Sequence, residues 1–260
     1  MIFFLKKHFE LNYACFTDAG TCRANNQDSF FCLGTFPECD AAPMQQVLCG
    51  QTEPGSSRLF GVFDGMGGEY NGEIASFLAA KRAASFEVCS ENPADDLLLL
   101  CRNANSDICQ YAAENGIPSM GTTAAMLLFE KDRIYLCNIG DSKIFRCSKD
   151  GLEQISEDHL GIAAFGRKPP LSQNLGIPED EMTIEPYTTS GFYNPGDKYL
   201  ICSDGLTDLV SSAKIRSILR THSPQAAASA LIEEALSNGG KDNVTVIVIE
   251  ICRSRGFRKK

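Results

Sequence analysis

The chain has 260 residues, of which 43% are apolar, and this is enough for one large hydrophobic core or two small ones. Its net charge of -9 argues against a protein that binds nucleic acid, because such proteins normally present a basic surface. Basic residues do gather near the C-terminus, from Arg253 to Lys260. We interpret them as a solvated tail, and contact with an acidic partner is the alternative.

The twelve cysteines would suit a disulfide scaffold, but no two of them have C-x-x-C spacing, and the three histidines are isolated. We therefore expect no zinc site, and most cysteines to be small buried residues in a reducing compartment. The apolar start, Met1 to Leu5, is too short for a membrane span or a signal peptide. It is predicted to begin an edge strand, in a cytoplasmic protein without membrane contact.

In chain order, the first half predicts strands followed by two long helices. The predicted strands are Glu10–Asp18, Ser29–Leu33 and Leu59–Phe63, and residues 34–57 are predicted to be a loop. Helical spacing runs from Asn71 to Cys89. A second helix is predicted to begin at Pro93, with Asn92 as its cap, and to end near Asn115 at Gly116.

The second half changes mainly to strands. Thr123–Phe129, Ile134–Ile139 and Lys143–Cys147 are joined too closely for parallel crossovers, so they are predicted to form an antiparallel meander. Residues 156–180 show no period and are interpreted as a mobile excursion. The remaining expected elements are strands Met182–Thr188, Lys198–Cys202 and Val244–Ile251, and helices Ile215–Arg220 and Pro224–Leu236. This order predicts an α+β fold with antiparallel sheet, without a domain linker.

Four aspartates share one context, because each follows or precedes a predicted strand next to Gly or Asn; they are Asp64, Asp141, Asp204 and Asp242. Any one of them alone is typical of an ordinary turn. If the strand ends meet at one rim, two carboxylates about 5 Å apart repel by roughly 3 kcal/mol at an effective dielectric near 20. Such a group needs protons or a cation, and oxygen ligands favour Mg²⁺ or Mn²⁺.

The stretch from Phe60 to Gly68 is the centre of this hypothesis. A buried strand is predicted to deliver Asp64, and the following glycines are predicted to form a tight turn that brings the Gly65 carbonyl beside it. Arg23 offers a planar guanidinium to a phosphate dianion. Because two ions can lower the pKa of a shared water, the pattern predicts hydrolysis of a phosphate ester by in-line attack.

Six ordered motifs resemble the metal-dependent protein phosphatase family, the PP2C or PPM type, over nearly the whole chain. They are Arg23-Ala-Asn-Asn-Gln-Asp28, Phe63-Asp-Gly-Met-Gly-Gly68, Gly121-Thr-Thr123, Asn138-Ile-Gly-Asp-Ser142, Cys202-Ser-Asp-Gly205 and Gly240-Lys-Asp-Asn-Val-Thr-Val246. The resemblance implies a four-layer α-β-β-α sandwich in one domain, residues 1–260, with two antiparallel sheets flanked by helix pairs. Residues 156–180 match the family's flap.

The resemblance also implies a role for each site residue. Asp64 would bridge two Mn²⁺ or Mg²⁺ ions, the Gly65 carbonyl would complete one site, and Asp204 and Asp242 would ligate the other ion. Asp28 would hold metal-bound waters, Arg23 would bind the substrate phosphate, and Asp141 matches a position associated with a third, weaker metal.

Two residues depart from the wider family pattern. Gln27 stands where many members carry an acid, which weakens any direct metal contact there, and Met66 stands where the eukaryotic branch has a histidine. Met66 makes the chain similar to the bacterial branch, and a water on the metal would have to protonate the leaving group.

The expected function is dephosphorylation of phosphoserine and phosphothreonine in proteins, by a monomer that opposes a Ser/Thr kinase. The alternatives are a small-molecule phosphohydrolase with the same chemistry and a non-catalytic binding module. The non-catalytic binding module is disfavoured because all the aspartates of the motifs are present.

Overall fold

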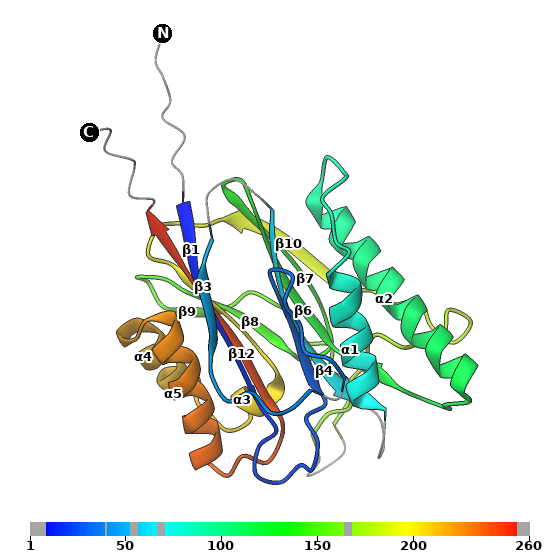
Figure 1. Ribbon diagram of the computed structural model, residues 1–260. Helices are drawn as coiled ribbons and strands as arrows, with labels where there is room; N and C mark the ends of the chain where they lie inside the picture. Colours follow the sequence, from blue (N-terminus) through cyan, green and yellow to red (C-terminus); the bar gives the residue numbers. More distant parts are fainter. Residues whose placement is uncertain (1–8, 40, 53–56, 67–70, 164–167, 254–260) are drawn as a thin grey trace.

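The computed structural model describes residues 9–39, 41–52, 57–66, 71–163 and 168–253, and they form two antiparallel sheets packed face to face (Figure 1). The first sheet has the order β3-β1-β12-β11-β8-β9. Its strands are β1 (Phe9–Asp18), β3 (Leu48–Gln51), β8 (Lys143–Cys147), β9 (Leu152–Gln154), β11 (Lys198–Cys202) and β12 (Val244–Arg253).

The second sheet has the order β10-β7-β6-β4-β2, with the short β5 paired to β4. Its strands are β2 (Asp28–Cys32), β4 (Arg58–Met66), β5 (Gly121–Thr122), β6 (Ala124–Glu130), β7 (Arg133–Ile139) and β10 (Tyr187–Phe192).

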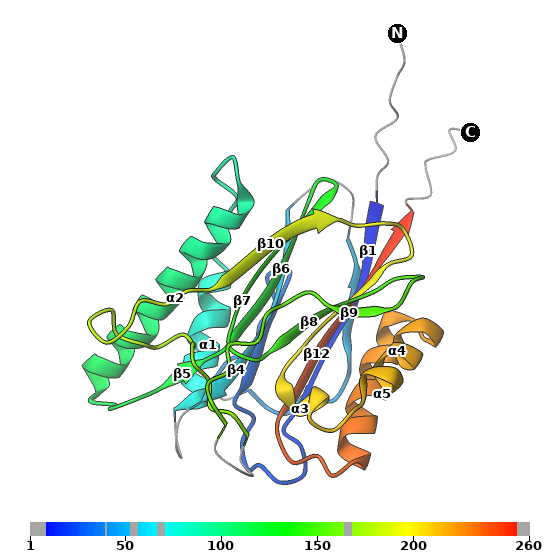
Figure 2. The ribbon, with the colours of Figure 1, turned by 180° about the vertical axis from the view of Figure 1, so that it is seen from behind.

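Helices cover the outer face of each sheet, so the molecule has four layers (Figures 1 and 2). The second sheet is covered by α1 (Gly72–Ala83) and α2 (Pro93–Asn115), and the first by α4 (Ser212–Thr221) and α5 (Pro224–Ser237). A single-turn helix, α3 (Asp204–Thr207), follows β11 directly. This is the predicted α-β-β-α sandwich.

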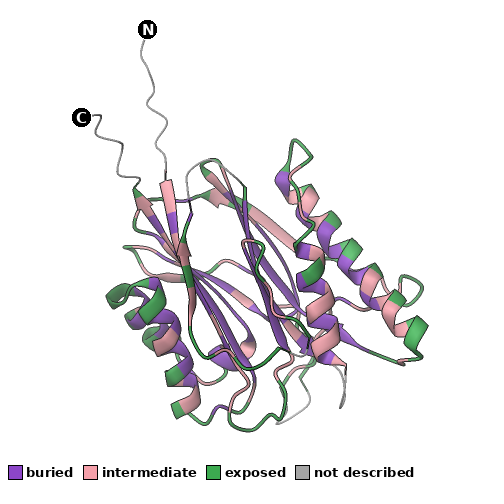
Figure 3. Ribbon diagram, viewed as in Figure 1, coloured by how far each residue is buried: buried purple, intermediate pink, exposed green. Residues whose placement is uncertain are grey.

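Three apolar clusters correspond to the three spaces between these layers, and the central strands of each sheet, such as β4, β6, β11 and β12, are buried along most of their length (Figure 3). The middle cluster, between the sheets, is rich in aromatic rings that meet edge to face. The rings of Phe129 and Tyr199, from opposite sheets, lie 5.5 Å apart between centroids. Such contacts fix how the two sheets are aligned.

Several predicted boundaries are confirmed where local chemistry sets them. α2 begins at Pro93 and ends at Asn115, with Asn92 accepting a hydrogen bond from the Ala94 amide and Gly116 in the left-handed conformation at φ 64°. β8 and β11 also have the predicted bounds. α1 is shorter than expected and ends at Ala83, and β10 begins at Tyr187, later than the predicted Met182.

The predicted meander is wrong in one respect, because β7 and β8 belong to different sheets. Only β6 and β7 pair with one another, while β8 pairs with β9 and β11. The chain crosses between sheets at Gly140, whose φ of 95° suits glycine and whose added Cβ would lie 2.6 Å from a Thr123 methyl. The predicted loop 34–57 contains a further strand, β3.

Residues 156–180 contain no helix or named strand in their described part, as predicted, and isolated bridges join Leu160 to Leu171 and Leu175 to Thr122. The expected edge strand at Met1–Leu5 lies outside the described residues. The expectation that most cysteines are buried is wrong: six of the twelve are buried, and Cys22, Cys39, Cys49 and Cys89 are exposed.

Candidate active site

The predicted acidic residues meet at one end of the sandwich, on the seam between the sheets. Asp28 begins β2 and is the direct cross-strand partner of Asp64 in β4. Asp204 begins α3 after β11 in the other sheet, and Asp242 lies just before β12 (Figure 1). Asp141 lies in the crossing from β7 to β8.

The pKa of Asp64 is raised by its surroundings. Burial raises its pKa well above the usual value, and the negative charges of Asp28, Asp204, Asp141 and Asp242 raise it further. All four are therefore near enough to disfavour its ionised form. The structure thus brings the aspartates named from the sequence within electrostatic reach of Asp64.

Hydrogen bonds fix the backbone of Asp64. Its amide donates to Thr123 Oγ1 at 3.0 Å, and its carbonyl accepts from Thr122 Oγ1 and from the Thr123 amide, each at 2.9 Å. Thr123 Oγ1 also lies 2.6 Å from Ser142 Oγ, next to Asp141. The β5–β6 junction thus connects Asp64 with the Asp141 crossing.

Gly65 does not begin the predicted tight turn; β4 continues through Gly65 to Met66, which pairs with Gly121. Glycine is needed here because two backbones pass close to it. The Gly65 amide donates to the Gln27 carbonyl at 3.1 Å, and an added Cβ would lie 2.1 Å from the Gly72 oxygen. The Gly67 and Gly68 part of the predicted turn lies outside the described residues.

Asp28 is held in a buried polar ring. Ser203 Oγ donates to Asp28 Oδ2 at 2.7 Å and accepts from the Thr245 amide, and Thr245 Oγ1 lies 2.6 Å from Thr17 Oγ1. Asn26 closes the ring by donating to Thr17 and accepting from the Asp28 amide. Burial raises the pKa of Asp28 to about 7, although the Ser203 hydrogen bond opposes this shift.

Arg23 lies at the exposed rim of the site. Its Nη2 donates to Asp242 Oδ2 at 2.8 Å, and about half of its side chain, 52%, is exposed. Asn243 anchors the same loop by accepting from the Gln27 amide and donating to the carbonyls of Ala19 and Asn25. The Arg23 guanidinium can therefore reach solvent while its backbone stays close to Asp242.

Lys168, from the irregular segment, also reaches the candidate site. Its Nζ contacts Asp204, lies 3.3 Å from Asp141 Oδ2 and 3.1 Å from Asp208 Oδ2. Burial lowers the pKa of Lys168, but the charges of Asp204 and Asp141 outweigh this and raise it. Lys168 thus supplies a cationic group to two of the predicted metal ligands.

The donor set suits divalent cations in its chemistry. The acidic side chains offer only oxygen, and Asp28 Oδ1 is buried without a hydrogen-bond partner in the structure. Across the described ranges, however, no three His, Cys, Asp or Glu side chains are arranged to hold an ion as they stand. Arg23 and Lys168 instead neutralise Asp242, Asp204 and Asp141.

The sequence matches the family model described as Protein phosphatase 2C over residues 42–238. The chain belongs to the protein phosphatase 2C family. It is 33% identical over 257 residues to the serine/threonine protein phosphatase PstP of Mycobacterium tuberculosis H37Rv, covering 93% of this chain but 45% of PstP. The chain thus spans less than half the length of this relative. Stp of Listeria innocua, a serine/threonine phosphatase, is 27% identical over 90% of this chain and 93% of Stp.

Solved structures of this family share the fold. The crystal structure of the M. tuberculosis phosphatase PstP gives a TM-score of 0.78 at 30% identity, covering 94% of this chain and 100% of that one. The structure of the PstP catalytic domain in complex with two manganese ions gives a TM-score of 0.76 at 31% identity, covering 94% of this chain and 99% of that one.

Several residues that position this phosphatase-family site were not singled out from the sequence. Ser203 and Asn243 each stand beside a site aspartate within one of the motifs above, and that position was the available signal. Thr123 ends the Gly121-Thr-Thr123 motif without a neighbouring aspartate. Gln27 was expected only to weaken metal contact; its side chain donates to Glu73 at 3.1 Å and its carbonyl supports Gly65. Nothing in the sequence pattern indicated Lys168.

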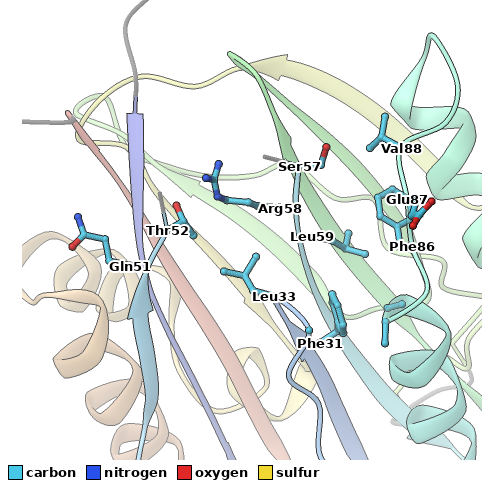
Figure 4. A pocket seen from close by; sticks show the side chains of 13 residues that line it. Phe31, Leu33, Gln51, Thr52, Ser57, Arg58, Leu59, Phe86, Glu87 and Val88 are labelled. Carbon is cyan, nitrogen blue, oxygen red and sulfur yellow. The ribbon is translucent and has the colours of Figure 1, made fainter. Parts of the chain in front are cut away.

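A hollow of about 890 Å³ lies at the other end of the sandwich (Figure 4). Leu33, Leu59 and Phe86 form apolar walls, and Arg58 points into the space between the sheets. None of the site aspartates lines it, because Asp28 and Asp64 lie at the opposite ends of β2 and β4. This hollow and the candidate active site therefore lie at different ends of the sandwich.

Proposed function

We propose that this protein hydrolyses phosphoserine and phosphothreonine in proteins at a centre of two Mn²⁺ or Mg²⁺ ions. The observation that carries the proposal is that carboxylates from both sheets gather around Asp64. Burial raises the pKa of Asp64, and the charges of its four acidic neighbours raise it further. A group of acids that disfavours its own ionisation is stabilised by divalent cations.

We assign the site residues as the family resemblance implies. Asp64 and the Gly65 carbonyl would hold one ion, and Asp64, Asp204 and Asp242 the other, with Asp28 acting through water and Asp141 at a third, weaker position. When bound, the ions supply a water activated for attack on phosphorus. The orphaned Asp28 Oδ1 and the all-oxygen donor set support this assignment.

Arg23 would bind the substrate phosphate. Its guanidinium is half exposed and contacts only Asp242 among the hydrogen bonds of its side chain in the described residues. The planar donors of the Arg23 guanidinium would suit a phosphate that enters from solvent, because they lie beside Asp242, one of the residues that would hold an ion. Arg23 thus orients the substrate while the buried ring keeps Asp28 in place.

The wider assignments follow from the same proposal. Phosphoproteins, including a Ser/Thr kinase, would be the substrates of a monomeric, cytoplasmic enzyme, and residues 156–180 would form a flap on the single domain 1–260. The names of PstP and Stp as serine/threonine phosphatases support the substrate class. In the described part of the chain, no helix is both long and apolar enough to cross a membrane.

The test is phosphate release from a phosphothreonine peptide with Mn²⁺, with Mg²⁺ and with EDTA. We expect turnover that requires the metal and is lost by at least about a hundredfold in Asp64→Asn and Asp204→Asn. Folding of both variants is checked by circular dichroism. Full activity in EDTA would overturn the proposal.

Parallel assays on nucleotides and sugar phosphates separate the protein phosphatase from a small-molecule phosphohydrolase. Faster turnover of these compounds than of phosphopeptides would favour the latter. No turnover of any phosphate ester with either metal would favour the non-catalytic binding module.

A further inference from the structure

A hollow of about 390 Å³ lies beside the candidate active site, between the end of α2 and residues 174–181. Met66 forms part of its wall, only two residues beyond Asp64 in β4. Because an extended chain rises about 3.3 Å per residue, the hollow begins roughly 7 Å from Asp64. This distance equals about two residues of an extended peptide.

Apolar side chains make up about half of the lining of this hollow. Ala112 and Ala113 from α2, Ile117 and Met120 after it, and Ile177 from the opposite segment all contribute. Ala113 is exposed and the Met120 side chain is buried, so the hollow has an apolar floor and an open mouth. Such a surface suits an aliphatic side chain.

The hollow is held open by specific hydrogen bonds. Leu175 pairs with Thr122 in both directions, at 3.0 and 2.9 Å. The buried Asn105 accepts from the amides of Gly176 and Ile177 at 2.7 and 3.1 Å and donates to the Ile177 carbonyl at 2.9 Å. A ligand would therefore meet a largely preformed surface, which reduces the entropy lost on binding.

One rim of the hollow is acidic. Glu181 lines it, and Glu179 and Asp180 come just before, all three exposed. Burial raises the pKa of Cys109, another lining residue, and the charges of Glu181, Asp180 and Glu179 raise it further. The ion pairs found among the described residues include none of these three carboxylates.

We propose that this hollow binds the substrate segment beside the phosphoresidue, taking an aliphatic side chain within two residues of it and a Lys or Arg next to that side chain. The apolar walls fit the aliphatic group, and the acidic rim fits the basic one. This inference rests on the proposed phosphatase function, and it adds the sequence class of the substrate.

The experiment measures kcat/KM with Mn²⁺ for phosphothreonine peptides in which one Leu is moved through positions -3 to +3 in an Ala background. A second series adds Lys next to the preferred Leu. We expect about a tenfold preference at one position within two residues of the phosphothreonine. Lys should add about threefold, decreasing with salt.

Variants connect these preferences to the hollow. Ala113→Trp, which fills the hollow from an exposed helix position, should abolish the Leu preference, whereas Ser106→Trp on the same helix should not. Glu179→Gln, Asp180→Asn and Glu181→Gln together should abolish the Lys preference only. Hydrolysis of a small aryl phosphate should change less than twofold in all of them.

The outcomes are separable. If wild-type protein hydrolyses the peptides without positional preference, or if the preference survives Ala113→Trp, the inference is wrong and the phosphatase function stands. If no phosphopeptide is hydrolysed while the protein is folded and metal-loaded, the proposed function itself fails.

Discussion

Gly65 and Gly205 each follow a site aspartate, and at each the absent side chain lets another backbone pass. An added Cβ at Gly65 would lie 2.1 Å from the Gly72 oxygen, and one at Gly205 would lie 2.0 Å from the Asn243 oxygen. The second contact brings the backbone of Asn243, which follows Asp242, against the start of α3, which carries Asp204. The Asp-Gly pattern thus pointed to the candidate site. The reason for glycine is the close approach of backbones, which could not be predicted from local sequence.

Gly65→Ala should therefore lower both stability and metal-dependent activity. The clash involves backbone atoms on both sides, which cannot move aside as a flexible side chain would, so we expect a loss of about 2 kcal/mol or more. Urea unfolding with and without Mn²⁺ measures this. The control is Gly151→Ala in the β8–β9 turn, where an added Cβ meets nothing within 4 Å, and an equal loss there would contradict the explanation.

For helices and strands, the sequence predicted the boundaries that are set by residues close in sequence. The bounds of α2 followed from Asn92, Pro93 and Gly116, which act within a few residues of themselves. The assignment of strands to sheets was not predictable in the same way, because β7 and β8 are separated by only three residues and still belong to different sheets. That crossing depends on the contact of Gly140 with Thr123, a residue distant in sequence.

The segment that carries Lys168 was predicted to be irregular, but its contact with the site was not. Because the Lys168 ammonium contacts Asp204 and Asp141, it competes with a cation for the same oxygens. Lys168→Met should tighten binding of the weakest class of Mn²⁺ by at least about threefold, measured by electron paramagnetic resonance titration. Lys149→Met removes an equal charge at the exposed β8–β9 turn and should leave affinity unchanged.

For the whole molecule, the site contributes a pH-dependent term to stability. The pKa of Asp28 is raised to about 7 from its usual 3.8, so the folded state binds a proton more tightly than the unfolded state. The stabilisation of the folded state that comes from protonated Asp28 is complete below about pH 4 and is lost as the pH rises through 7. Metal-free protein should thus be less stable at pH 8 than at pH 5, by up to about 3 kcal/mol.

Chemical denaturation in EDTA at several pH values checks this expectation. Asp28→Asn, which is uncharged at every pH and keeps a partner for Ser203, should flatten the profile. Added Mn²⁺ should reduce the loss at high pH, because the cation favours the ionised carboxylates. A metal-free profile that rises from pH 5 to pH 8 would show that other groups dominate.

The candidate ligands are divided between the sheets: Asp28 and Asp64 belong to one, while Asp204 and Asp242 adjoin strands of the other. The spacing of the ligands is therefore set by how far apart the sheets lie and how they are rotated. Packing in the middle cluster, such as the ring contact between Phe129 and Tyr199, controls that alignment without touching the site. Cation affinity therefore reports on packing between the sheets, far from the site. Substitutions in the middle cluster should change cation affinity before they unfold the chain.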